Sequence, residues 1–358
     1  MESKNKQRLV GRGSQLRTSG RFESVKLVHL STEPDAELPA KVATEFFEDA
    51  SQSIVSTNNS PDLPFNFSLN PYRGCVHGCS YCYARPTHEY LGWGPGVDFE
   101  SKIVVKRNAG KLFRDWLSKR QPEQIEPVMI SGVTDCYQTP EKQFRVTRDC
   151  LEAALEFRHP IQIITKNKLI LRDLDLLAEL AQMQLVSVRI SITSLDQSLI
   201  RVMEPRTSSP LARLETVAKL SEANIPTSVF LAPIIPGIND EEIPELLRQA
   251  SQHGATEAGY IVLRLPLTVQ EVFVNWLETH FPDRCDKVLS RIESLRDGKL
   301  NSSVFGERMK GTGVWAEQIR SMFQLFANKY KLSEEGRQLR CDLFRKTDEK
   351  GRTQGELF

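Results

Sequence analysis

The stretch NPYRGCVHGCSYCYAR, residues 70–85, contains three of the seven cysteines of this 358-residue chain. Cys75, Cys79 and Cys82 have the spacing C-x3-C-x2-C, and Tyr81 directly precedes the third cysteine. Three thiolates this close together can hold three irons of a [4Fe–4S] cube and leave the fourth iron open, whereas four thiolates would leave no iron free. The spacing therefore predicts an iron–sulfur centre on this segment.

The other cysteines leave alternatives open. A structural zinc site could use His77 or Cys136 as a fourth ligand, although the usual zinc pattern has paired C-x2-C hairpins and no second pair is present. Cys150 falls on an apolar helical stripe and is expected in the core, while Cys285 and Cys341 have no companion residues. A secreted disulfide framework would be denser and spread over a much shorter chain, and cysteines clustered in a reducing compartment point to a metal or to redox chemistry.

Short apolar runs alternate with stretches of helical period from about residue 65 onward. The runs expected to form strands are 66–69, 127–133, 161–165, 186–192, 227–233 and 258–264. The stretches expected to form helices are 141–158, 168–182, 209–223 and 240–252. Runs that are apolar at consecutive positions are typical of parallel strands covered on both faces. The order predicts an α/β fold with a parallel sheet, closed or partly closed into a barrel.

The sequence predicts four parts along the chain: an extension, a core, a helical segment and a tail. Residues 1–60 are expected to be a basic, flexible N-terminal extension, and residues 61–268 the barrel core. Residues 269–330 are expected to be a helical segment, with an apolar stripe that ends at Tyr330, and residues 331–358 a charged tail.

The overall charge and hydropathy exclude several classes of protein. The net charge is +1, with 47 basic and 46 acidic residues, so no chain-wide field favours nucleic acid or a membrane. No apolar run is long enough to span a membrane, and the N-terminus has no apolar segment typical of a signal peptide. We therefore expect a cytoplasmic protein.

The cysteine spacing with its aromatic residue resembles the radical S-adenosylmethionine (SAM) superfamily, whose members carry C-x3-C-x-aromatic-C after the first strand of a partial (βα)6 TIM-type barrel. Polar or glycine-rich motifs follow the later predicted strands: SGVTD (131–135), TKN (165–167), SITS (191–194), EPRTSS (204–209) and APIIPGIND (232–240). Their order over residues 65–265 is similar to the spore photoproduct lyase branch. Segments near residues 11–23 and 305–319 look like those of an uncharacterised bacterial subgroup of these proteins.

The resemblance implies a cofactor pair, a [4Fe–4S] cluster and SAM, with Cys75, Cys79 and Cys82 as the cluster ligands. It implies reductive cleavage of SAM to a 5′-deoxyadenosyl radical, which abstracts hydrogen from a substrate. An external low-potential electron donor of the flavodoxin or ferredoxin type is then required as a partner.

The resemblance also implies roles for residues after the strands. Those that would contact SAM are Tyr81 against the adenine, the backbone of Gly132, Val133 and Thr134 at the amino group, Lys166 and Ser191 at the carboxylate, Arg206 as a second carboxylate or ribose partner, and Ile235, Pro236 and Gly237 as the adenine wall. A surface salt bridge is an equal alternative for Arg206.

One departure affects the expected reaction. In the lyases a hydrogen-returning cysteine occupies the position that is Gly132 here, and this chain has Cys136 four residues later. Cys136 is therefore a candidate catalytic hydrogen donor or auxiliary ligand, and an inert loop cysteine is the alternative.

The sequence leaves more than one class of substrate possible. The resemblance favours a nucleic acid, in DNA repair or modification, and six basic residues between Lys4 and Arg21 could contact phosphates, although a solvated tail is the favoured interpretation. A peptide or small metabolite substrate, or a non-catalytic iron–sulfur or zinc binding module, is the alternative. The C-terminal residues Gln354, Leu357 and Phe358 resemble the peptide with which bacterial repair proteins dock on the sliding clamp.

Overall fold

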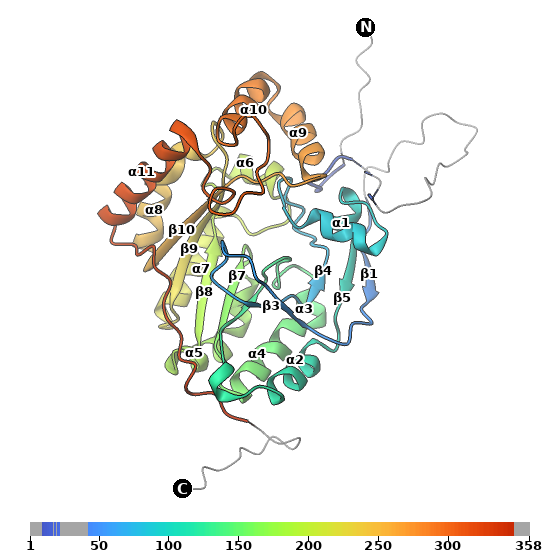
Figure 1. Cartoon of the computed structure of the whole chain (residues 1–358), viewed down its shortest axis with the longest axis vertical. Helices are drawn as coiled ribbons and strands as arrows, with labels where there is room; N and C mark the ends of the chain where they lie inside the picture. The colour runs from blue at the N-terminus through green and yellow to red at the C-terminus, as the bar shows by residue number, and fades with distance from the viewer. Residues whose placement is uncertain (1–8, 17, 19, 22–41, 347–358) are drawn as a thin grey trace, which may run out of the picture.

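The computed structural model describes residues 9–16, 18, 20–21 and 42–346 of the chain (Figure 1). The strands of this part are β1 Glu45–Glu48, β2 Val55–Thr57, β3 Phe67–Leu69, β4 Tyr72–Arg73, β5 Lys102–Val105, β6 Val128–Ile130, β7 Ile161–Thr165, β8 Val186–Ser191, β9 Thr227–Ile234 and β10 Glu257–Val262. Its α-helices are α1 Val97–Ser101, α2 Ala109–Ser118, α3 Glu141–Phe144, α4 Val146–Glu156, α5 Leu174–Gln182, α6 Gln197–Met203, α7 Pro210–Glu222, α8 Ile243–Gln252, α9 Val269–His280, α10 Cys285–Ser294 and α11 Gly313–Lys329.

The larger sheet has the strand order β10-β9-β8-β7-β6-β3-β2. Its six strands from β3 to β10 pair in parallel, and β2 pairs antiparallel with β3. The two outermost strands, β10 and β2, do not pair with each other, so the sheet is an open barrel rather than a closed one. The predicted α/β fold with a partial parallel barrel is confirmed.

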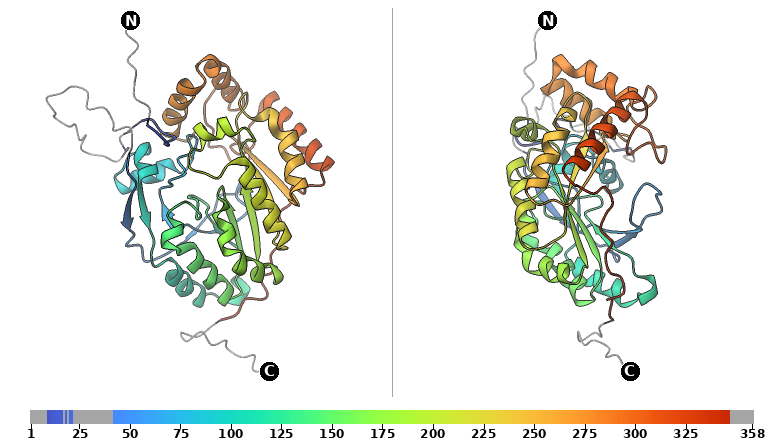
Figure 2. Two further views of the ribbon diagram at one scale, coloured as in Figure 1. Left: turned by 180° about the vertical axis from the view of Figure 1, so that it is seen from behind. Right: turned by 90° about the vertical axis from the view of Figure 1, so that its left-hand side faces the viewer.

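Helices cover one face of this sheet, as the side view in Figure 2 shows for the green and yellow helices. Ile163 of β7 and Val188 of β8 are almost fully buried, and such buried positions in a parallel sheet require apolar side chains. The predicted helix over 141–158 is instead two helices, α3 and α4. They are separated by Arg145, whose φ of 56° is left-handed and interrupts the helical hydrogen bonds.

The N-terminal range behaves differently from the flexible extension predicted over residues 1–60. β1 pairs in parallel with β5 in a three-stranded sheet, and β2 belongs to the larger sheet. Arg12 is only 4% exposed. The described part of this range is therefore held by strand pairing and by buried contacts such as those of Arg12. Its strands, EFFE and VST, are too short to show a sustained apolar period.

The C-terminal range contains the expected helices and a packed extension. α9, α10 and α11 follow the last strand, and on α11 Ile319 and Phe323 are buried. In the range predicted as a charged tail, Arg340 N donates to Gln184 O at 3.0 Å, and Phe344 is buried. Residues 331–346 thus run along the outside of the sheet toward the lower end of Figure 1. No helix of the described residues is long and apolar enough to cross a membrane.

Candidate functional site

The three cysteines lie on one loop between β4 and the 3-10 helix Arg85–Leu91. Cys75 and Cys79 are buried, Cys82 is partly exposed, and all three are free thiols. Gly74 and Gly78 have φ values of 76° and 67°, a conformation that glycine adopts without strain. Burial raises the pKa of all three thiols. Cys82 packs both against the hydrophobic cluster that contains Cys79 and against the one that contains Cys75, so the three cysteines lie close together.

This donor set fits an iron–sulfur cluster. Soft thiolates are the usual ligands of a four-iron cube, and each binds a different iron. In the described part of the chain, no three His, Cys, Asp or Glu side chains converge as the ligands of one single metal ion would, whereas the thiolates of a four-iron cube each bind a different iron. The fourth ligands of the zinc alternative are engaged elsewhere: His77 Nε2 lies 3.1 Å from Asn167 Nδ2, and Cys136 is fully buried.

Tyr81 connects the cysteine loop to a buried carboxylate that sequence analysis did not assign. The Tyr81 hydroxyl donates to Glu204, and the Lys166 ammonium lies 5.7 Å from the centre of the Tyr81 ring. Lys166 Nζ is 3.4 Å from Glu204 Oε1, and Arg213 forms an ion pair with the other Glu204 oxygen. Burial by itself raises the pKa of Glu204, but Arg213 and Lys166 hold it well below its ordinary value. Glu204 is therefore an ionised carboxylate in the interior.

Of the three residues predicted to bind the carboxylate of SAM, Lys166 and Ser191 lie beside the buried ion pairs of Glu204, and Arg206 does not. Lys166 Nζ donates to Thr193 Oγ1 and to Ala232 O, both at 3.2 Å, and Ser191 O accepts from Arg213 at 3.0 Å. Arg206 is the exception. Its Nε donates to Gly11 O at 2.9 Å, so its guanidinium contacts the N-terminal segment in place of the Lys166–Glu204 cluster.

The predicted amino-group site after β6 is ordered by an asparagine that sequence analysis missed. Asn70 Oδ1 accepts from Val133 N at 2.8 Å and from Thr134 N at 3.3 Å. The Gly132 carbonyl accepts from the hydroxyl of Tyr83, the residue after the third cysteine. Of the backbone atoms in this motif, the Gly132 carbonyl is thus the acceptor that faces the cysteine loop.

Cys136 is not part of this space. Its side chain belongs to the main hydrophobic core and is fully buried, its backbone N–H donates to Ser131 Oγ at 2.6 Å, and its carbonyl accepts from Thr147. The prediction of a catalytic Cys136 is therefore not supported by its position.

The predicted adenine wall after β9 is buried beside the cysteine loop. Ile235 packs in the same hydrophobic cluster as Cys79 and Tyr81. Pro236 is buried, and Gly237 has a φ of 85° with its N–H donating to Asp240 at 2.7 Å. The loops after β6, β7, β8 and β9 thus all meet the cysteine loop at the carboxyl ends of the parallel strands, where barrels of this kind carry their working residues.

A second set of contacts, which the sequence did not reveal, attaches the N-terminal segment to the cysteine loop. The buried carboxylate of Glu100 accepts from Gly13 N at 3.1 Å, Ser14 N at 2.8 Å and the Arg85 guanidinium at 2.5 Å. Arg85 also donates to Cys79 O at 2.7 Å. Segment 9–16 therefore forms one wall of the cysteine loop.

This packing changes the expectation that the arm contacts phosphates. Arg12 is buried and donates to Glu100 O and Val42 O, and Arg21 pairs with Glu89. The basic residues Lys4, Lys6, Arg8 and Arg17 lie outside the described residues, as do Gln354, Leu357 and Phe358.

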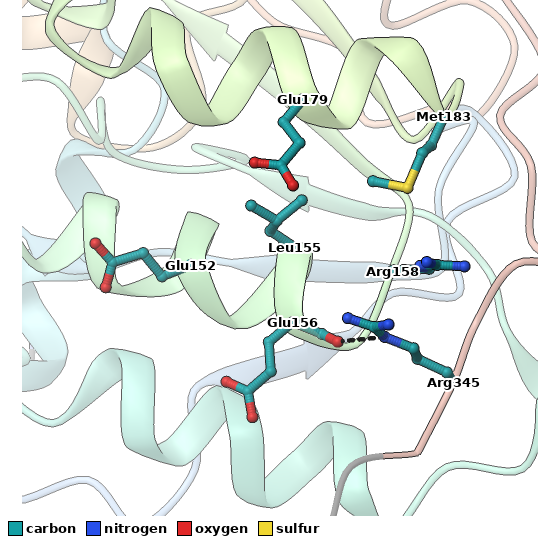
Figure 3. Close-up of a pocket in the computed structure, with 7 residues that line it drawn as sticks. All are labelled: Glu152, Leu155, Glu156, Arg158, Glu179, Met183 and Arg345. Carbon is teal, nitrogen blue, oxygen red and sulfur yellow. Dashed lines mark hydrogen bonds between the residues drawn. The ribbon is translucent and has the colours of Figure 1, made fainter. Parts of the chain in front are cut away.

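Figure 3 shows a pocket in another part of the molecule. It is lined by Glu152, Leu155, Glu156, Arg158, Glu179, Met183 and Arg345. These residues come mainly from the ends of α4 and α5, which precede the amino ends of β7 and β8. The pocket is therefore remote from the cysteine loop and from the strand ends that surround it.

Comparison with known proteins agrees with this arrangement. The family model described as the radical SAM superfamily matches residues 69–250, just over half of the chain. An uncharacterised protein of Mycobacterium tuberculosis is 37% identical over 227 residues, which is 63% of this chain and 66% of the relative's length. An uncharacterised protein of Methanocaldococcus jannaschii is 32% identical over 179 residues, 49% of this chain and 63% of that relative. The chain thus spans somewhat less than two thirds of these relatives.

Among solved structures, spore photoproduct lyase has the same fold. Its complex with dinucleoside spore photoproduct has a TM-score of 0.57 and 16% sequence identity, covering 80% of this chain and 78% of the lyase. A cysteine-to-serine mutant of the lyase has a TM-score of 0.58 and 18% identity over the same shares.

Proposed function

Because the chain belongs to the radical SAM superfamily, we propose that it is an enzyme that cleaves SAM reductively at the cysteine loop and uses the product to activate a macromolecular substrate. The superfamily's cofactors are a [4Fe–4S] cluster and SAM. When bound, they supply a 5′-deoxyadenosyl radical that removes hydrogen from the substrate. The observation that carries this proposal is the loop of three free thiols surrounded by the carboxyl ends of parallel strands.

Each wall of this site has a defined task in the proposal. Cys75, Cys79 and Cys82 would hold the cluster. The Lys166 ammonium would hold the SAM carboxylate by a charge-assisted hydrogen bond, while Glu204 fixes its position. The Gly132 carbonyl would accept from the methionyl amino group.

The apolar side of the site would receive the adenine. Tyr81 and Ile235 lie in one buried hydrophobic cluster together with Cys79. Such dry walls exclude water and limit side reactions of a reactive species. The packed segment 9–16 would contribute by holding the cysteine loop in place through Glu100 and Arg85.

The substrate class we propose is a nucleic acid, in a repair or modification reaction in the cytoplasm. It is supported by the fold shared with spore photoproduct lyase, which has been solved in complex with dinucleoside spore photoproduct. A lyase reaction that uses Cys136 as hydrogen donor is left out of the proposal, since that thiol is fully buried in the core.

Two partners complete the proposal. An external flavodoxin- or ferredoxin-type protein would supply the low-potential electron. A sliding clamp would bind the C-terminal peptide that contains Gln354, Leu357 and Phe358. Deletion of residues 354–358 should abolish recovery of the clamp in a pull-down, and recovery unchanged by the deletion would exclude this partner.

The central test is anaerobic reconstitution. The wild-type protein should bind about four irons per chain and form 5′-deoxyadenosine when SAM and dithionite are added. A variant with Cys75, Cys79 and Cys82 all replaced by alanine should do neither, whereas Cys341→Ala, which removes a free cysteine near the C-terminus, should behave as wild type. A cluster-loaded wild-type protein that never cleaves SAM, even with DNA present, would favour a non-catalytic binding module.

A further inference from the structure

The segment 304–310 bridges the two unpaired ends of the open barrel. On one side, Val262 N of the edge strand β10 donates to Met309 O at 2.9 Å. On the other side, Gly306 N donates to Asp62 Oδ1 at 2.6 Å, and the Arg308 guanidinium pairs with the same carboxylate. Asp62 lies in the loop between β2 and β3. Segment 304–310 therefore links the edge strand β10 to the loop between β2 and β3.

Arg264 lies at this bridge without a carboxylate partner among the described residues. It follows β10 by two residues, and its only hydrogen bond within that part of the chain is from Nη1 to Met309 Sδ at 3.4 Å. Its Nε atom is buried without a partner. Burial and the neighbouring Arg308 lower the pKa of Arg264, while the charges of Tyr83 and Asp62 raise it less, so its pKa stays below the ordinary value. A partly buried guanidinium without an acceptor is costly for a folded chain, and an anion placed against it would offset that cost.

Exposed aromatic rings accompany this unpaired charge. Phe305 is 55% exposed, and the Arg308 guanidinium carbon lies 4.5 Å from the centre of its ring. Tyr83 is 49% exposed, and its hydroxyl donates to Gly132 O after β6. Tyr83 and Arg264 are close enough for the charge of each to influence the other. Tyr83 directly follows the third cysteine, and its bond to Gly132 O places it at the strand ends where Arg264 follows β10.

The charge balance of this cluster favours an anionic ligand. Arg264 and Arg308 contribute two positive charges, and Asp62 is the single carboxylate that pairs with either of them in the described structure. Asp62 is already bound by Arg308 and by Gly306 N. A guanidinium matches the geometry of a phosphate, and exposed rings provide surfaces on which bases can stack.

We propose that Arg264, Phe305 and Tyr83 form the site at which a single nucleic acid strand docks at the mouth of the barrel, with Arg264 on a backbone phosphate and Phe305 against a base. This inference rests on the proposed function and names the surface that presents its substrate to the cysteine loop. It also gives a role to segment 304–310, which joins β10 to the loop between β2 and β3 and contains Phe305.

The test is a binding measurement on the reconstituted full chain with a fluorescein-labelled oligothymidylate, followed by fluorescence anisotropy over a range of KCl concentrations. Arg264→Gln should weaken binding about tenfold and reduce the slope of log K against log salt by about 1, because one phosphate contact is lost. Arg264→Lys should keep the wild-type salt slope with an intermediate affinity, since it keeps the charge without the planar fork. Phe305→Ala should weaken binding about tenfold with an unchanged salt slope.

The matched control is Arg248→Gln, which removes an exposed arginine of α8 that pairs with Glu245. It should bind the oligonucleotide as wild type does. Equal affinity of Arg264→Gln and Arg248→Gln would overturn the inference. Competition by thymidine monophosphate as effective as by unlabelled oligothymidylate, at equal phosphate concentration, would also overturn it and indicate a small nucleotide as the ligand.

The outcome is separable from that of the proposed function. Formation of 5′-deoxyadenosine by the wild-type protein is measured without oligonucleotide. Wild-type protein that forms it and does not bind the oligonucleotide refutes the docking site alone. Protein that binds the oligonucleotide and never cleaves SAM refutes the proposed chemistry and leaves the docking site standing.

Discussion

Replacement of Glu100 by alanine should release the N-terminal segment from the cysteine loop. The Glu100 carboxylate is fully buried and holds three donors: Gly13 N at 3.1 Å, Ser14 N at 2.8 Å and Arg85 at 2.5 Å. Arg85 is also fully buried, and it donates in turn to Cys79 O. The substitution therefore affects both the wall of the site and the backbone of one proposed cluster ligand.

The expected magnitude follows from what is left without a partner. Removal of one member of a buried ion pair costs about 3–5 kcal/mol, because the other charge stays buried and uncompensated. Arg85 keeps its acceptors at Cys79, Pro95 and Gly96, which places the loss at the lower end of that range. The two backbone N–H groups add about 1–3 kcal/mol in total if water does not reach them. We expect a loss of about 4 kcal/mol in the free energy of unfolding.

The assay is anaerobic urea unfolding followed by circular dichroism, with iron content measured after gel filtration. Glu100→Ala should lower the unfolding free energy by about 4 kcal/mol and release iron faster than wild type. Glu100→Gln keeps one acceptor oxygen and should lie between the two. Glu245→Ala, which removes an exposed partner of Arg248, is the control and should leave both readings unchanged. A loss for Glu100→Ala below about 1 kcal/mol would refute the reasoning, since it would equal an exposed pair.

Three further predictions concern packing and protonation. Gly13→Ala would place a Cβ against Gly78 O, so we expect the free energy of unfolding in urea to fall by about 3 kcal/mol and iron to be retained more weakly. The control is Gly336→Ala, because a Cβ there meets nothing within 4 Å. Equal free energies of unfolding for the two variants would contradict the close packing of Gly13. Burial lowers the pKa of His159 to about 3 from its ordinary value of 6.5, so its contribution to stability is complete above pH 6.5 and is lost as the pH falls toward 3. The free energy of unfolding of the wild-type protein should be lower at pH 5 than at pH 7, and His159→Phe should reduce this difference by about 2 kcal/mol. The same difference in the variant as in wild type would argue against a neutral buried imidazole. Cys136→Ala should cost about 1 kcal/mol of stability and leave 5′-deoxyadenosine formation intact, whereas its abolition would restore Cys136 as a functional residue.

The elements that the sequence predicted correctly are those with a local signal. Strands such as β7 and β8 are short runs rich in Ile and Val, and the cysteines that identify the family lie within eight residues of one another. The break at Arg145 was missed because a single left-handed residue other than glycine leaves no compositional trace. β1 and β2 were missed because their stability comes from pairing with distant strands rather than from their own pattern.

Local sequence patterns were enough to predict the α/β class, the six parallel strands in their chain order, and the loop that carries the three thiols. Only the tertiary structure decided which side chains face that loop. Glu204 meets Tyr81 across 123 positions, Glu100 meets Gly13 across 87, and Arg206 reaches Gly11 across 195. Periodicity and spacing report interactions within a few residues, whereas the partner of a buried charge is set by how distant segments pack. For that reason the sequence that located the proposed metal ligands left two alternatives each for Arg206 and Cys136, and the contacts of Arg206 with Gly11 and of Cys136 with the main core come from distant packing.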